Sequence, residues 1–415
     1  MVAKSKNELV LGIDLGGTKT LVGVVDRDGR ILGRGKLSTP SHQGGDAIVD
    51  VIARAAETAI LESGKSFDEV AMAGIGSPGP LDIDKGMILF SANMDVVNYP
   101  IAEKLSERFG VPTVLRNDVR ASCYAEWKLG AGKGMNNLLG AFVGTGLGGC
   151  LIIDGKLHVG HDGNAGEIGH IKAKPNGAKC GCGLKGCLEV YASKTGLVRR
   201  FAKARKRGVS SQLFRIWSGP DQKLKSRYLA ECYKSGDSLV LEELQRAARF
   251  LGGSLGGLVN LLSPEAVILG GGVSLALGEP WLNWVRTAAK EHMLVVPEDR
   301  ETILPAALGD DAGVLGAALL ARESRQAGTL RRRIVIRRLI EFRVGANGKK
   351  HDSNMGAEHS EYYGSTMLDS QRIQEVQGNT SCLPFLGCER SKIGLISSIP
   401  RLSFCSDEEF CLRFT

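Results

Sequence analysis

The densest group of reactive side chains in the sequence is one histidine followed by three cysteines. His170 closes the stretch Gly-Glu-Ile-Gly-His, and Cys180, Cys182 and Cys187 follow in the segment Cys-Gly-Cys-Gly-Leu-Lys-Gly-Cys. Zinc prefers thiolate and imidazole ligands, and four of them complete a tetrahedral site. Because no coordination position then remains open, we predict a structural zinc ion. Free thiols in an ordinary glycine-rich loop are the alternative.

A glycine-rich turn near the N-terminus could hold phosphate. Gly16 and Gly17 allow backbone N–H groups to approach phosphate oxygens closely. Thr18 adds a hydroxyl donor and Lys19 a positive charge, while Asp14, at the end of a predicted strand, could hold Mg²⁺ through water. The spacing matches neither the Walker A motif nor the dinucleotide-binding motif, and a plain hairpin turn is the alternative.

Two further glycine runs lie in the second half of the chain. Gly144-Thr145-Gly146 begins a second turn between predicted strands, so each half would contribute one turn to a triphosphate. Gly271 and Gly272 belong to a third run that follows a buried strand. This run leaves room for a flat ring against the backbone, although turn chemistry explains it equally well.

A carboxylate follows the predicted strand Val111–Leu115. Asn117 and Asp118 stand there, and a carboxylate at a strand end is placed to face a cleft. Deprotonation of a sugar hydroxyl needs such a base within hydrogen-bond reach. Asparagine and aspartate are also ordinary turn residues, and spacing alone favours that interpretation.

The predicted strands and helices that position these residues alternate along the chain. Residues 9–115 predict the order βββαβαβ, with a helix at 46–62, and the second half repeats this order. Further helices are predicted at 101–109, 194–207, 239–262, 280–293 and 312–322. We therefore expect an α/β protein whose two similar units form a cleft, which is a common place for ligand sites.

Length and composition agree with that expectation. The 415 residues suffice for two domains, and 43% apolar with 24% charged residues exclude a mainly disordered, collagen-like or coiled-coil chain. A net charge of +8 does not by itself indicate nucleic-acid binding. The polar start lacks the apolar core of a signal peptide, and the uncharged stretch 134–153 is too rich in glycine for a membrane span. We predict a soluble, cytoplasmic protein without membrane or nucleic-acid partners.

The end of the chain differs from the rest. Few of the 55 glycines occur after residue 330, and regular periodicity fails there. We predict that residues 328–415 form an atypical, disordered or loosely docked tail.

The motifs together resemble the ROK family (repressors, open reading frames, kinases), and within it bacterial glucokinases. DxGGTK, the Asn-Asp pair, GTGxGG, ExGH and CxCGxxGCxE occur in that order within about residues 8–325. The resemblance implies the actin-like, ribonuclease-H-like ATPase fold, with two α/β domains around a central cleft. Residues 1–118, completed by a helix at about 310–325, would form the first domain, and residues 119–309 with the zinc loop the second.

The resemblance also implies an activity and its site. It implies ATP-dependent phosphorylation of a hexose 6-hydroxyl, glucose first, by a homodimer with Mg²⁺ and structural Zn²⁺. Asp118 would be the general base. The implied sugar-binding residues are Gly79, Asn93, Asn117, Asp118, Glu167, His170 and Glu189. The implied ATP-binding residues are Asp14, Gly16, Gly17, Thr18, Lys19, Thr145, Gly146, Gly271 and Gly272.

Several alternatives remain open at this point. An N-acetylhexosamine kinase or a fructokinase would share the same motifs. Many family glucokinases continue Asn-Leu-Pro-Gly-Trp after the sugar-binding asparagine, whereas this chain continues Asn93-Met-Asp-Val-Val-Asn-Tyr99. A non-catalytic sugar-sensing regulator is less favoured, because the 13 residues before Asp14 are too few for the DNA-binding domain of such proteins.

Overall fold

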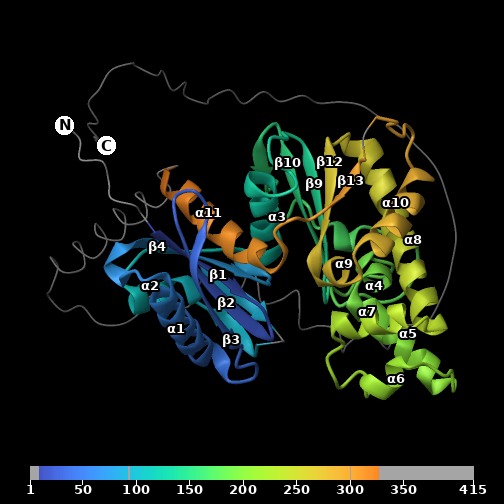
Figure 1. The fold of residues 1–415 in the computed structure, drawn as a ribbon, viewed down its shortest axis with the longest axis horizontal. Coiled ribbons are helices and arrows are strands. Elements are labelled where there is room, and N and C mark those ends of the chain that lie inside the picture. The colour runs from blue at the N-terminus through green and yellow to red at the C-terminus, as the bar shows by residue number, and fades with distance from the viewer. Residues whose placement is uncertain (1–8, 92–93, 300, 327–415) are drawn as a thin grey trace, which may run out of the picture. The chain divides into compact units, whose positions relative to one another are not determined.

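Two mixed β-sheets organise residues 9–91, 94–299 and 301–326, the part of the chain that this computed structural model describes (Figure 1). In the first sheet the strand order is β3-β2-β1-β4-β8. The first three strands form an antiparallel meander, and β4 is parallel to both β1 and β8. The strands are β1 (Leu9–Leu15), β2 (Lys19–Val25), β3 (Ile31–Ser38), β4 (Val70–Ser77) and β8 (Thr113–Asn117).

The second sheet repeats this arrangement, in the order β11-β10-β9-β12-β13. Again three strands form an antiparallel meander, and β12 is parallel to both β9 and β13. The strands are β9 (Leu138–Val143), β10 (Leu147–Ile153), β11 (Lys156–His158), β12 (Ala266–Gly270) and β13 (Ile303–Pro305). The α/β class predicted from the sequence is confirmed, and the two sheets share one topology.

Helices surround both sheets, and a small third sheet follows β4. The helices are α1 (Gly44–Ser63), α2 (Ile101–Phe109), α3 (Asp118–Leu129), α4 (Glu189–Ala192), α5 (Lys194–Lys206), α6 (Leu213–Ile216), α7 (Ser226–Lys234), α8 (Ser238–Leu262), α9 (Gly271–Leu277), α10 (Glu279–Lys290) and α11 (Ala312–Gln326), with short 3₁₀ turns at Phe67–Glu69, Ile168–His170 and Gly309–Asp311. The small sheet, absent from the sequence prediction, contains β5 (Leu81–Asp82), β6 (Met87–Ser91) and β7 (Val96–Tyr99).

Alternation along β1 decides which way Asp14 points. The odd-numbered residues from Leu9 to Leu15 are buried in the cluster that contains the apolar residues of α1 and α2. Val10 instead packs in the cluster that contains Val314 of α11. Because side chains alternate between the two faces of a strand, Asp14 shares a face with Val10 and approaches Gly313 near the start of α11.

Helices α3 and α11 pack between the two sheets (Figure 1). Apolar residues of α3 share a buried cluster with Leu138 and Phe142 of β9 and with Leu320 of α11. Helix α11 also lies on the first sheet so closely that a Cβ atom on Gly74 would stand 2.0 Å from the carbonyl oxygen of Ala317. The helix that carries Asp118 is therefore fixed against both sheets.

Some sequence predictions fall beyond the described residues. The tail predicted for residues 328–415 lies outside them, as does Asn93. The domain boundaries predicted at residues 118 and 309 stay a prediction. Within the described part of the chain, no helix is both long enough and apolar enough to cross a membrane.

Candidate active site

Two carboxylates lie at the carboxyl ends of parallel strands in the first sheet. Asp14 is in β1 beside Gly76 of β4, and Asp118 directly follows β8 as the first residue of α3. Burial raises the pKa of Asp14 to about 6, the negative charge of Asp118 adds to the rise, and Lys19 opposes it. This edge of the sheet therefore concentrates negative charge, which a divalent cation would stabilise.

The first turn of α3 holds Asp118 in a defined position. The side-chain oxygen of Asn117 caps the helix by accepting the N–H of Arg120 at 3.0 Å. Oδ1 of Asp118 accepts the N–H of Val119 at 2.9 Å. Burial raises the pKa of Asp118, and the charge of Glu167 adds to this effect. A raised pKa makes the carboxylate a stronger base than an exposed aspartate.

Hydrogen bonds to other residues of the protein fix the turn between β1 and β2. The N–H of Gly16 donates to the carbonyl oxygen of Lys19 at 3.0 Å. The hydroxyl groups of Thr39 and Ser41 donate to the carbonyl oxygens of Gly16 and Gly17 at 2.6 and 2.9 Å. These carbonyl groups are satisfied inside the protein, which removes the acceptors that would repel an anion at the turn.

Two lysine side chains lie at this turn, one from each half of the chain. Lys19 Nζ pairs with Asp310 at 2.7 Å, and this hydrogen bond lowers the pKa of Asp310. Lys223, in the segment between α6 and α7, donates to Oγ1 of Thr18. The first glycine turn therefore has positive charge beside it from both halves of the chain.

The turn between β9 and β10 is joined to the predicted zinc region. The N–H of Gly144 donates to the carbonyl oxygen of Gly146 at 2.9 Å, which closes the turn. Oε2 of Glu189 accepts the N–H of Leu147 at 3.0 Å, and its Oε1 lies 3.6 Å from Sγ of Cys180. Glu189 thus links the second glycine turn to the cysteine cluster.

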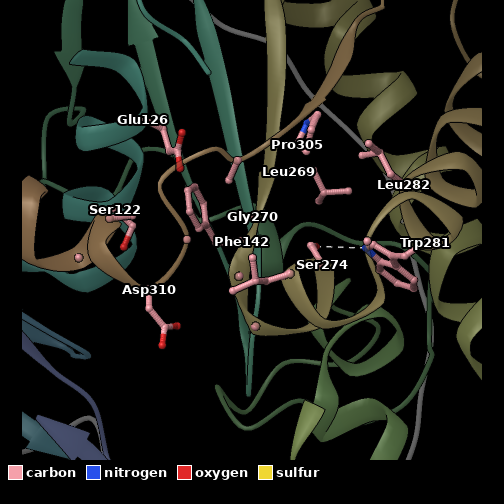
Figure 2. Close-up of a pocket in the computed structure, with 18 of the residues that line it drawn as sticks. Ser122, Glu126, Phe142, Leu269, Gly270, Ser274, Trp281, Leu282, Pro305 and Asp310 are labelled. Carbon is pink, nitrogen blue, oxygen red and sulfur yellow. Dashed lines mark hydrogen bonds between the residues drawn. The ribbon is translucent and has the colours of Figure 1, made fainter. Parts of the chain in front are cut away.

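A cavity of about 410 Å³ extends from Asp14 to the third glycine run. Figure 2 shows apolar Phe142, Leu269 and Trp281 on its walls, together with acidic Glu126 and Asp310. Four of the predicted ATP-binding residues line it, namely Asp14, Lys19, Gly271 and Gly272. The size and mixed lining of the cavity suit a small ligand with one flat apolar part and one charged part.

The third glycine run is more than the turn that the sequence predicts. Gly271 and Gly272 begin helix α9. The φ angle of Gly271 is +88°, and a Cβ atom there would stand 2.5 Å from the carbonyl oxygen of Val143. Glycine is needed here for both conformation and space.

The predicted residues Gly16, Gly17, Thr18, Thr145 and Gly146 are not among those that line the cavity.

The predicted zinc ligands gather in one place. The ligand atoms of His170, Cys180, Cys182 and Cys187 all lie within 4.8 Å of one another. Sγ atoms of Cys182 and Cys187 are 3.8 Å apart, and Nδ1 of His170 is 3.9 Å from Sγ of Cys180. Sulfurs bound at about 2.3 Å to one tetrahedral ion stand about 3.8 Å apart. The donor set and its spacing therefore fit zinc.

Of the other predicted sugar residues, Glu167 contacts α3, and His170 and Glu189 contact the cysteines. Glu167 stands 3.9 Å from Nη2 of Arg120 and is close enough to Asp118 to raise its pKa. His170 and Glu189 both contact Cys180. Gly79 lies in the segment between β4 and β5. The structure therefore brings Glu167, His170 and Glu189 into one neighbourhood with the metal cluster.

Sequence reasoning missed several polar residues of this region. Arg120 is buried, donates from Nη2 to the carbonyl oxygen of Ala165 at 3.0 Å, and holds the segment that leads to Glu167. Fully buried Glu126 accepts the N–H groups of Ala307 and Leu308 at 3.0 and 2.8 Å, and so anchors the segment before Asp310. No local motif marks either residue, because each acts on a segment distant in sequence.

Comparison with known proteins finds a family model and several similar sugar kinases. The model of the ROK family matches residues 10–324. A glucokinase of Streptomyces coelicolor is 38% identical over 320 residues, which cover 76% of this chain and 98% of that protein. An N-acetylmannosamine kinase of Yersinia pestis is 33% identical over 317 residues, which cover 76% of this chain and 98% of that protein.

A solved structure supports the same relationship. The ROK family glucokinase of Streptomyces griseus, crystallised with glucose and AMPPNP, matches with a TM-score of 0.66 and 37% identity, covering 76% of this chain and 99% of that one. The actin-like ATPase fold of ROK kinases, predicted from the sequence, is thereby confirmed. The chain is homologous to glucokinases and other sugar kinases, and it belongs to the ROK family.

Proposed function

We propose that this chain transfers the γ-phosphate of ATP to the 6-hydroxyl group of a hexose, with glucose as the preferred acceptor. The observation that carries the proposal is the position of Asp118. This half-buried carboxylate directly follows the end of β8, close to the negative charges of Asp14 and Glu167. Similarity to the Streptomyces coelicolor glucokinase supports glucose as the acceptor.

In the proposed reaction Asp118 accepts the proton of the 6-hydroxyl group. The hydroxyl oxygen forms a bond to the γ-phosphorus, the bond between that phosphorus and the β,γ-bridging oxygen breaks, and ADP leaves. Such a transfer depends mainly on positioning and on neutralising charge. The N–H groups of the two glycine turns and the Lys19 ammonium group would supply the neutralisation. Mg²⁺, held through water by Asp14, would shield the phosphate charges when bound.

We assign the other hydroxyl groups of the sugar to Asn93, Asn117, Glu167, His170 and Glu189, beside Gly79. Zinc would have no open coordination position, so its role would be to hold the loop that carries these side chains. Glu189 connects that loop to the N–H of Leu147 in the second turn. The same loop would then position residues of both the sugar site and the nucleotide site.

An N-acetylhexosamine kinase is the second candidate, because the Yersinia pestis N-acetylmannosamine kinase is 33% identical over most of its length. A coupled assay of ADP release separates the candidates, with glucose, mannose, fructose, N-acetylglucosamine and N-acetylmannosamine as acceptors. We expect the highest kcat/KM for glucose. A higher value for an N-acetylhexosamine would favour the second candidate, and sugar-independent ADP release alone would contradict both.

A further inference from the structure

Lys223 reaches the first glycine turn from the second half of the chain. It precedes α7, and its Nζ atom donates a hydrogen bond to Oγ1 of Thr18, which is 205 positions away in the sequence. The hydroxyl group of Thr18 is neutral. It accepts a hydrogen bond but supplies no negative charge, whereas an ammonium group has three donors and a full positive charge. The contact therefore positions Lys223 without neutralising it.

Lys194 is fixed beside the second glycine turn. It is the first residue of α5, and its N–H donates to the carbonyl oxygen of Gly144 at 3.1 Å. The N–H and the hydroxyl group of Thr195 both donate to the carbonyl oxygen of Thr145, at 3.1 and 2.8 Å. The start of α5 and the turn therefore form one rigid unit, with the Lys194 side chain at their junction.

The two ammonium groups are close enough to repel each other. Burial lowers the pKa of Lys194, and the positive charge of Lys223 lowers it further. Lys223 is exposed, and partial desolvation by its surroundings lowers its pKa. Lys19 beside the same turn has its carboxylate partner, Asp310. Across residues 9–91, 94–299 and 301–326, no ion pair joins Lys194 or Lys223 to a carboxylate.

Lys194 is half-buried and Lys223 is exposed, and a bound polyanion would relieve the repulsion between these two cations, which have no carboxylate counterion. Lys223 contacts the first glycine turn through Thr18, and Lys194 contacts the second through Gly144. Backbone N–H groups of glycine-rich turns bind phosphate oxygens in many proteins. A chain of phosphate groups is therefore the ligand whose charge and length this arrangement suits.

We propose that Lys194 and Lys223 bind the β- and γ-phosphate groups of the donor nucleotide between the two glycine turns. This inference rests on the proposed kinase function and adds two binding residues to it. Lys223 would exchange its bond with Thr18 for a phosphate oxygen, or share the phosphate with that hydroxyl group. Because Lys194 and Lys223 come from α5 and the segment before α7, donor binding would fix both segments against the first turn.

The test measures nucleotide binding by calorimetry, so that it does not depend on turnover. The variants are Lys194→Gln, Lys223→Gln and the double variant. The matched controls are Lys206→Gln, at the exposed end of α5, and Lys225→Gln, two positions beyond Lys223. The probes are AMPPNP, AMP and inorganic tripolyphosphate, each with Mg²⁺. Unchanged thermal unfolding would show that each variant is folded.

Hydrogen bonds between ammonium and phosphate groups are among the stronger ones, so we expect each variant to bind AMPPNP about 10-fold more weakly. The double variant should lose tripolyphosphate binding, while AMP affinity and the controls stay within about 2-fold of wild type. Lys223→Arg should lose less AMPPNP affinity than Lys223→Gln does, because arginine keeps the positive charge. AMPPNP affinity within about 2-fold of wild type in the double variant would overturn the inference, as would an equal loss for AMP.

Sugar phosphorylation separates this inference from the proposed function. If the wild-type protein phosphorylates glucose and the lysine variants have the same KM for ATP as wild type, the inference is contradicted and the proposed function is not. A wild-type protein that binds AMPPNP through both lysines but phosphorylates no sugar would support the inference and contradict the proposed function. Glucose phosphorylation driven by ATP, by inorganic polyphosphate or by both identifies the donor, and in each case loss of donor binding in the double variant supports the site.

Discussion

Asp118 combines burial with a place at the end of a strand, and both properties affect its chemistry. The folded protein holds its proton to a higher pH than the unfolded chain does. The stability that this group contributes is therefore greatest in acid, and it falls as the pH rises from about 4 through the raised pKa. At neutral pH the desolvation of this carboxylate therefore lowers the stability of the fold.

Asp118→Asn should consequently lose activity without losing the fold. Removal of the general base should lower kcat by about 10²–10⁴-fold, while the midpoint of thermal unfolding at pH 7 rises because the desolvated carboxyl group is gone. Glucose affinity should stay close to that of wild type. Steady-state kinetics, calorimetry and thermal unfolding measure the three quantities. A variant that keeps more than about a third of the wild-type turnover would rule out this role.

Burial raises the pKa of Asp14 to about 6. If its charged form holds Mg²⁺, the affinity for Mg–AMPPNP should fall as the pH drops through about 6. Because the charge of Asp118 contributes to this raised pKa, the fall should move to lower pH in Asp118→Asn. Calorimetric titrations between pH 5 and 8 check both statements. An identical pH profile in the two proteins would contradict this coupling.

At the scale of elements, the loop that carries the four predicted zinc ligands connects the sugar residues to the second glycine turn. We expect one zinc ion per chain. Cys182→Ser should lower the metal content, because a neutral hydroxyl group does not replace a thiolate. The KM for sugar should then rise most, and thermal stability should fall. The KM for ATP should rise less, through the bond between Glu189 and Leu147.

Metal analysis of protein purified without chelator, with kinetics on both substrates, checks these statements. Cys123→Ser provides a control at a buried cysteine on α3, outside the cluster. Protein that contains no zinc would contradict the site. Loss of ATP affinity with normal sugar binding in Cys182→Ser would contradict its role.

Element patterns also explain what the sequence could predict. Apolar spacing at 46–62 predicted α1 (Gly44–Ser63) to within two residues at its start and one at its end. Strands β5, β6 and β7, of 2, 5 and 4 residues, were missed, and β5 and β7 are too short to show an alternation. The contact between Lys223 and Thr18 was inaccessible for another reason: it joins two segments that only the tertiary fold brings together.

At the scale of the whole molecule, the family match ends at residue 324, close to the end of α11. All the site residues named above lie before that point. We therefore expect a chain cut after Ala327 to fold and to phosphorylate glucose with a kcat similar to that of the full chain. Thermal unfolding and steady-state kinetics of the two proteins make the comparison. Aggregation or loss of activity would show that residues 328–415 belong to the functional fold.

The identity of the product tests the central claim most directly. Purified protein is incubated with glucose and Mg–ATP, and the products are followed by ³¹P and ¹H NMR, with Asp118→Asn as the control. We predict glucose 6-phosphate and ADP in equal amounts, formed by wild type and nearly absent with Asp118→Asn. Absence of any sugar phosphate, or a phosphate group on a hydroxyl other than the 6-hydroxyl, would contradict the proposed reaction.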